Sequence, residues 1–135
     1  MKNKSLIGVL RYGVAGLFLF LQAGHAQSLQ TPDQVVNSYL ASLVNGNAAQ
    51  LASLIGGAKK RDNPQITLDP EYYGQFLQKH YRDAVATVEE MSPDGESWKA
   101  RVRIDFPTGG SQTTTLIVRL VDGEWKVTDE KVQGL

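Results

Sequence analysis

The sequence predicts an α+β domain of two layers, in which N-terminal helices pack on one face of a four-stranded antiparallel sheet. Between residues 31 and 81 the apolar residues recur at helical spacing, whereas from residue 85 to residue 132 they alternate with polar ones. Turn residues divide the second part into four pieces of strand length. Helices followed by such a meander bury one sheet face and leave the other in water.

The first 26 residues are expected to be a secretory signal and not part of the fold. Three basic residues lie among the first eleven, an uncharged and mostly apolar run follows at residues 12–21, and small residues precede Ala26. A membrane-spanning helix needs about 20 apolar residues, which is longer than this run. We therefore expect cleavage after Ala26, which leaves residues 27–135 as one periplasmic or secreted domain outside the membrane.

The composition of residues 27–135 excludes several classes of function. They hold 11 basic and 14 acidic side chains, a formal charge of −3, which argues against binding to nucleic acid. The sequence has no cysteine, so neither a disulfide nor a lipid-anchoring cysteine is available. His80 is the single histidine of this part, which excludes a zinc site built from histidine and cysteine. We expect no metal and no cofactor.

Two helices are expected at the start of the domain. Thr31 and Gln34 can form a capping box around a proline in the first turn, and Gly46 suits the left-handed residue after a helix. The residues between them carry an apolar stripe at helical spacing. Asn47 can cap a second, shorter helix that ends at residues 56–57.

The next segment lacks a helical period and is expected to be a surface loop. It covers residues 58–68 and contains the basic triplet 59–61, for which a solvated loop tip is favoured over an anion-binding role. Asp69 and Pro70 then repeat the helix-start signal. An aromatic helix is expected from there as far as Tyr81.

Four strands are expected in the second half of the domain, separated by turn residues. They are Val85–Met91, Trp98–Phe106, Thr113–Val121 and Trp125–Val132. The dipeptide Asp122-Gly123 indicates a two-residue hairpin between the last two strands. This hairpin sets their register, in which Arg119 lies opposite Lys126.

The opening segment TPDQVVNSYLASLVNGNAAQLASLI, the aromatic helix and the closing DGEWKV form one pattern across residues 31–132. This pattern resembles the nuclear transport factor 2-like superfamily of cystatin-like cones, especially its small secreted bacterial domains of unassigned function. The resemblance implies a curved sheet that wraps the long helix and leaves a pocket. Such cones include enzymes, ligand binders and protein-binding modules, so the resemblance indicates fold rather than function.

Aromatic side chains are the candidates for lining this pocket, because a small-ligand site is concave and mostly apolar. The candidates are Tyr39, Tyr72, Tyr73, Phe76, His80, Tyr81 and Trp98. An aromatic core whose polar tips reach the surface is the competing interpretation of the same residues, and the favoured one. An acid/base isomerase or dehydratase of the cone type is the alternative function, but no aligned acid/base pair identifies a catalytic residue.

The outer sheet face is expected to gather positive charge and to offer a surface for a protein partner. The candidates for this surface are Lys99, Arg101, Arg103, Ile117, Arg119, Val121 and Lys126. Asp105, Glu124 and Glu130 are expected nearby, so an idle solvated face is the competing interpretation. We predict a binding protein without enzymatic activity, which acts on a protein partner, as inhibitors and immunity proteins do, or on a small apolar or aromatic ligand.

The export signal predicts the N-terminus of the mature protein. Because Ala26 closes a small-residue cleavage motif, the exported chain should begin at Gln27. N-terminal sequencing of protein from the periplasm or medium checks this. A chain that keeps Met1 and stays with the membrane fraction contradicts it.

Overall fold

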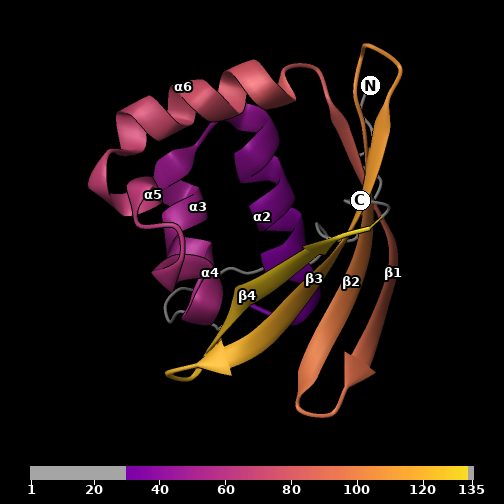
Figure 1. Cartoon of the computed structure of the whole chain (residues 1–135). Helices are drawn as coiled ribbons and strands as arrows, with labels where there is room; N and C mark the ends of the chain where they lie inside the picture. Colours follow the sequence, from indigo (N-terminus) through magenta and orange to yellow (C-terminus); the bar gives the residue numbers. More distant parts are fainter. Residues whose placement is uncertain (1–29, 134–135) are drawn as a thin grey trace, which may run out of the picture.

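The computed structural model describes residues 30–133, in which helices precede a four-stranded antiparallel sheet (Figure 1). The helices are α2 Pro32–Asn45, α3 Ala48–Leu54, α4 Gly57–Arg61, α5 Gln65–Leu68 and α6 Pro70–Tyr81. The strands are β1 Val85–Asp94, β2 Ser97–Asp105, β3 Ser111–Val121 and β4 Glu124–Val132. The predicted α+β fold is confirmed, whereas the expected signal and its cleavage point lie outside the described residues. No described helix is long and apolar enough to cross a membrane.

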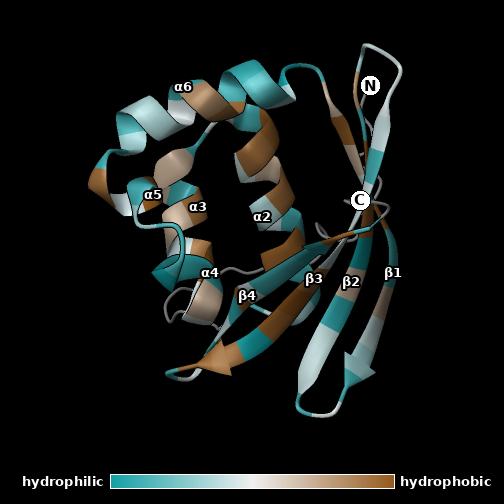
Figure 2. Cartoon of the chain, in the orientation of Figure 1, coloured by the Kyte–Doolittle hydropathy of each residue, from teal (hydrophilic) through white to brown (hydrophobic). Residues whose placement is uncertain are grey.

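The core lies between the helices and the inner face of the curved sheet. All the helices stand on one side of the sheet, and hydrophobic residues run along α2, which faces it (Figures 1 and 2). In β2 the inward residues Ala100, Val102 and Ile104 are buried, while the alternating Arg101 and Arg103 are exposed. The alternation read from the sequence therefore gives the two faces correctly.

Local capping signals determine where the three longer helices begin. The Thr31 amide donates to Gln34 Oε1 at 3.0 Å, and the Gln34 amide donates to Thr31 Oγ1 at 3.4 Å, which confirms the capping box. The side chains of Asn47 and Asp69 cap α3 and α6 in the same way, at 3.0 Å and 3.1 Å. Gly46 ends α2 with φ +68°.

Two glycines allow α6 to cross closely over the turn between α2 and α3. A Cβ atom added at Gly74 would lie 2.9 Å from the carbonyl oxygen of Gly46, which is a backbone atom that cannot easily give way. A Cβ atom at Gly46 would collide with the side chain of Gln78. This crossing fixes the middle of α6 against the helix pair.

The expectation of a surface loop at residues 58–68 is wrong, because this segment contains the short helices α4 and α5. Ile66 of α5 is 1% exposed and belongs to the core cluster. Just before α4, Ile55 forms a parallel bridge with Val127, and the Gly56 amide donates to the Val127 carbonyl at 3.0 Å. Such short helices form because they pack against the rest of the fold, not because of their own periodicity.

The predicted hairpin register is confirmed at Arg119 and Lys126, which are cross-strand partners. Farther along β4 the pairing shifts by one residue, since Val118 pairs with Val127 whereas Ile117 pairs with Asp129. Thr128 is therefore the extra residue of a β-bulge. Because successive strand residues point to opposite faces, the bulge exchanges the inner and outer positions of the last four residues of β4.

Replacing Ile66 by Ala should lower the free energy of unfolding by about 2–5 kcal/mol, because the buried side chain leaves a cavity. Leu68→Ala in the same short helix is the matched control, since Leu68 is 80% exposed and its truncation should change little. Urea denaturation of both variants checks the prediction. Equal losses of stability would mean that α5 does not anchor the segment through Ile66.

Candidate functional site

Glu130 is the charged residue that the bulge in β4 turns toward the helices. It pairs across the sheet with Leu116, which is 1% exposed and part of the core. The sequence-based expectation placed Glu130 on the outer face, and the extra residue Thr128 overturns it. Its carboxylate forms an ion pair with the Lys59 ammonium from α4, and the two side chains are only 20% and 18% exposed. A half-buried ion pair therefore lies at the mouth of the cone.

Three tyrosines gather around this carboxylate. Tyr39 of α2 is 2% exposed, and the Lys59 nitrogen lies 6.0 Å from the centre of its ring. Burial raises the Tyr39 pKa well above its usual value, with the charge of Glu130 adding to the effect. Burial and then Glu130 also raise the pKa of Tyr73, and they raise that of Tyr81 to about 12. All three hydroxyls thus keep their protons near neutral pH and can donate hydrogen bonds.

An open, solvent-facing cavity of about 390 Å³ lies beside the ion pair, between α4, the end of α6 and strands β3 and β4. It is lined by Ala58, Lys59, Asp62, Asn63, Tyr81, Gln112, Thr128, Asp129, Glu130 and Val132. Polar and charged groups therefore dominate its wall, while Tyr81 and Val132 supply apolar surface. This volume lies within the range of about 300–1,000 Å³ that is common for small-molecule sites.

The structure brings together three of the seven predicted pocket residues and separates the others. Tyr39, Tyr73 and Tyr81 lie near enough to Glu130 for its charge to raise their pKa values, and Tyr81 lines the cavity whereas Tyr39 and Tyr73 do not. Of the other four, three lie on the exposed side of α6 and one packs at the margin of the core. These are Tyr72, Phe76 and His80 on α6, and Trp98 on β2 opposite Val118. The broad aromatic face expected for this helix is therefore divided between the pocket and the surface.

Exposed apolar and aromatic side chains at the end of α5 and along α6 form a ridge. Leu68, Tyr72, Phe76 and His80 follow at intervals of four residues, and the first three are 80%, 69% and 48% exposed. The rings of Phe76 and His80 stack with centroids 5.7 Å apart and an angle of 8° between their planes. This placement removes His80 from the lining of the cavity.

Sequence reasoning missed Lys59 and Glu130, which are the two charges of the site. Lys59 belongs to the basic triplet 59–61, for which the sequence favours a solvated loop tip over an anion-binding role. At Lys59 this expectation is wrong, because the side chain is mostly covered and contacts the Glu130 carboxylate. The sequence of β4 does not show that Glu130 points inward. The alternation of polar and apolar residues near the bulge is compatible with either face of the sheet. Sequence reasoning also missed Gln112 and Asn63 in the cavity wall. They come from the ends of segments that only the tertiary fold brings together.

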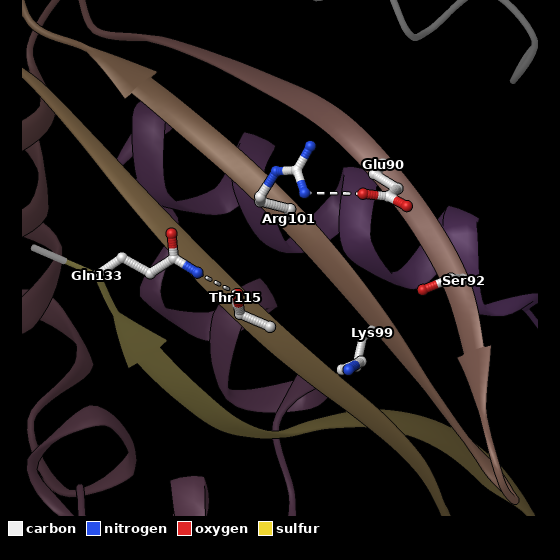
Figure 3. Close-up of a pocket in the computed structure, with 6 residues that line it drawn as sticks. All are labelled: Glu90, Ser92, Lys99, Arg101, Thr115 and Gln133. Atoms are coloured by element: carbon white, nitrogen blue, oxygen red, sulfur yellow. Dashed lines mark hydrogen bonds and ion pairs between the residues drawn. The ribbon is translucent and has the colours of Figure 1, made fainter.

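On the outer face, a shallow groove of about 260 Å³ crosses β1, β2 and β3 (Figure 3). It is lined by Glu90, Ser92, Lys99, Arg101, Thr115 and Gln133. Arg101 donates to Glu90 at 2.8 Å and to Glu89 at 3.3 Å. Lys99 forms no ion pair within residues 30–133.

Carboxylates neutralise most of the positive charge expected on this face. Arg103 pairs with Glu89 and Asp105 at 3.1 Å and 3.2 Å, and Arg119 pairs with Asp129. Lys126 pairs with Glu124 and also donates to the Ser53 carbonyl at 2.6 Å, so its side chain reaches the helical layer. Together with Arg101, four of the five expected cations are therefore paired, and they do not form a free basic patch.

The two apolar anchors expected on the outer face are not available there. Ile117 is only 7% exposed, and Val121 is half-buried beside Gly56. The expectation assumed a flat face, whereas the curved sheet brings Val121 against the segment that precedes α4. A protein partner would find ion pairs at this surface and no exposed apolar centre.

Within residues 30–133 there is no group of three or more histidine or acidic side chains arranged to hold a metal ion. The lining of the cavity can instead donate and accept hydrogen bonds. Lys59 and Glu130 are the cationic and anionic groups in contact at its wall.

No protein-family model and no curated protein matches the sequence. The structure is similar to a proposed NTF2-like transpeptidase from Campylobacter jejuni, with a TM-score of 0.53 and 17% identity over 74% of this chain and 99% of that one. An NTF2-like protein of unknown function from Cytophaga hutchinsonii matches with a TM-score of 0.49 and 12% identity, over 80% and 95%. A proposed polyketide cyclase from Sinorhizobium meliloti matches with a TM-score of 0.47 and 18% identity, over 73% and 93%.

The raised pKa of Tyr81 predicts a loss of stability in alkali. Its neutral form is favoured in the fold, so its contribution is complete below the ordinary value of 10.0 and disappears as the pH rises through about 12. Tyr81→Phe cannot ionise and should lose less stability than the wild type over that interval, by a difference of about 2 kcal/mol. Urea unfolding across the interval checks this, and parallel pH profiles for the two proteins contradict it.

Proposed function

The chain has the NTF2-like fold, and on this premise we propose that it is a binding protein whose cone pocket holds a small polar ligand. The observation that carries the proposal is the Lys59–Glu130 ion pair in the wall of a cavity of about 390 Å³. Tyr81 and Val132 offer apolar surface for the body of the ligand, and Glu130 offers an acceptor. A concave site with a few directed polar groups is the usual form of a small-molecule site.

The energetics of the ion pair favour a role in binding over a role in stability. Removing two charges from water costs free energy that their attraction only partly recovers, and well-packed apolar residues often serve stability equally well. Lys59 and Glu130 are mostly covered, yet they lie at a cavity and not in the sealed core. We infer that the pair is placed there to meet a ligand.

An acid/base enzyme is supported less well by the same residues. Such an enzyme needs a group that is free to take or give a proton at the substrate. The Glu130 carboxylate is engaged by Lys59, the three tyrosines hold their protons, and His80 lies outside the cavity. Turnover of a bound ligand that Glu130→Gln abolishes without weakening binding would favour the enzyme.

A protein partner is the second candidate function, and the ridge on α5 and α6 favours it. The ridge exposes apolar surface at Leu68, Tyr72 and Phe76. Apolar surface exposed to water does not stabilise a monomer, and a continuous patch of it marks a site of interaction. A partner of the inhibitor or immunity type would dock more readily on this ridge than on the neutralised outer face. For either function we propose that the domain acts in the periplasm or outside the cell, after removal of residues 1–26.

Filling the cavity should abolish ligand binding. Val132 lies on the cavity wall and is 36% exposed, so Val132→Trp can occupy the space without a change in the core. We expect fragments that shift the amide resonances of the cavity residues in the wild type to bind the variant at least about tenfold more weakly. A screen of neutral, cationic and anionic fragments by amide chemical shifts measures this.

Leu120→Trp is the matched control, because Leu120 is an exposed residue of the same sheet that does not line the cavity. It should bind fragments as the wild type does. Fragment shifts confined to the ridge of α6 or to the outer groove would contradict the pocket as the site of function.

A further inference from the structure

The Lys59 ammonium occupies the position in which a cationic ligand would meet the carboxylate. It contacts Glu130 and lies 6.0 Å from the centre of the Tyr39 ring. A cation beside a carboxylate and over an aromatic face is the arrangement by which proteins bind ammonium groups. Here one side chain of the protein itself takes that place.

The charges of the cavity wall favour a second cation over an anion. The lining includes the acidic residues Asp62, Asp129 and Glu130 and one cationic residue, Lys59, and of these acids Asp129 turns its carboxylate outward to Arg119. Asp129 is paired with Arg119 and Asp62 with Arg61, both of which lie outside the lining, whereas Lys59 is the only cation paired with Glu130 within residues 30–133. An anion that approached Lys59 would also meet Glu130 and be repelled.

Resting on the proposed function, we propose that the cone pocket takes a ligand with a primary amine or similar cationic group, which binds Glu130 and displaces Lys59. A carboxylate has about four lone-pair positions, so the incoming ammonium can bind Glu130 before Lys59 leaves. The hydroxyl of Tyr81, which lines the cavity, can hydrogen-bond to the rest of the ligand. No bond of the ligand is broken in this exchange.

The structure gives Lys59 a way to leave. It lies on α4, a helix of five residues without a side-chain cap, which begins at Gly57 with φ +55°. Three residues farther along the chain, Asp62 ends α4 and lies exposed in the cavity lining, where its carboxylate is paired with the exposed Arg61. Side chains at this spacing are neighbours on a helix surface, so the released ammonium can pair with Asp62.

Three probes that share one ring and differ in charge test the ligand class: benzylamine, benzyl alcohol and phenylacetate. Titration of the purified protein, followed by amide chemical shifts, should show benzylamine binding at the cavity at least about tenfold more tightly than the other two. Higher salt should weaken the binding of benzylamine and leave the binding of benzyl alcohol unchanged, because screening acts on charged pairs. This comparison needs no variant.

Two variants test the displacement. Lys59→Met removes the internal competitor and should raise the affinity for benzylamine about tenfold, if Lys59 occupies the site for about nine-tenths of the time. Lys60→Met is the matched control, since Lys60 is an exposed neighbour outside the cavity lining, and it should change nothing. Glu130→Gln should abolish the preference for benzylamine over benzyl alcohol.

The outcomes separate this inference from the proposed function. Equal binding of all three probes at the cavity would overturn the amine ligand and leave the pocket as a binding site. A lower affinity of Lys59→Met for benzylamine would overturn the displacement. Absence of any probe-induced shift in the cavity residues would overturn the proposed function itself.

Discussion

One extra residue in β4 decides which charges lie inside the cone. Without the bulge at Thr128, strand alternation would continue from Val127 to place Asp129 inward and Glu130 in solvent. With the bulge, Asp129 joins Arg119 on the outside and Glu130 joins the tyrosines on the inside. The cavity, its ion pair and the proposed ligand all depend on this local shift in pairing. Bulges occur often beside functional sites for the same reason, since they redirect a side chain without a change of fold.

The bulge would leave a bare carboxylate under the helices if α4 did not supply a counter-charge. The segment before α4 is joined to β4 through the Gly56 amide and the Val127 carbonyl, one residue before the bulge. That hydrogen bond brings Lys59 to the correct height along the strand to meet Glu130. The same short stretch of β4 thus positions both members of the pair. An uncompensated charge at this depth would cost far more than the pair does.

Features that depend on residues close together in the sequence could be predicted, whereas those that depend on distant residues could not. The capping box of α2, the helix stop at Gly46 and the hairpin register depend on residues within four positions of each other, and these predictions are confirmed. The fold class follows from the same periodicities. The site does not, because Lys59 and Glu130 are 71 residues apart in the chain and meet only through tertiary packing. Lys59 lies on a five-residue helix without a buried side chain, and Glu130 lies on a strand whose alternation is interrupted by a bulge, so neither residue carries a local signal of the site.

Both edge strands of the sheet carry features that hinder pairing with a strand of another molecule. Beyond β4, the backbone of Ile55 and Gly56 already engages Val127 where a foreign strand would add. At the other border, β1 carries a register shift beside Glu89 and a proline at position 93, so it offers no unbroken row of amide and carbonyl groups. Backbone geometry therefore hinders edge-to-edge growth into fibrils at each side, and because salt does not screen it, this resistance should persist at high ionic strength.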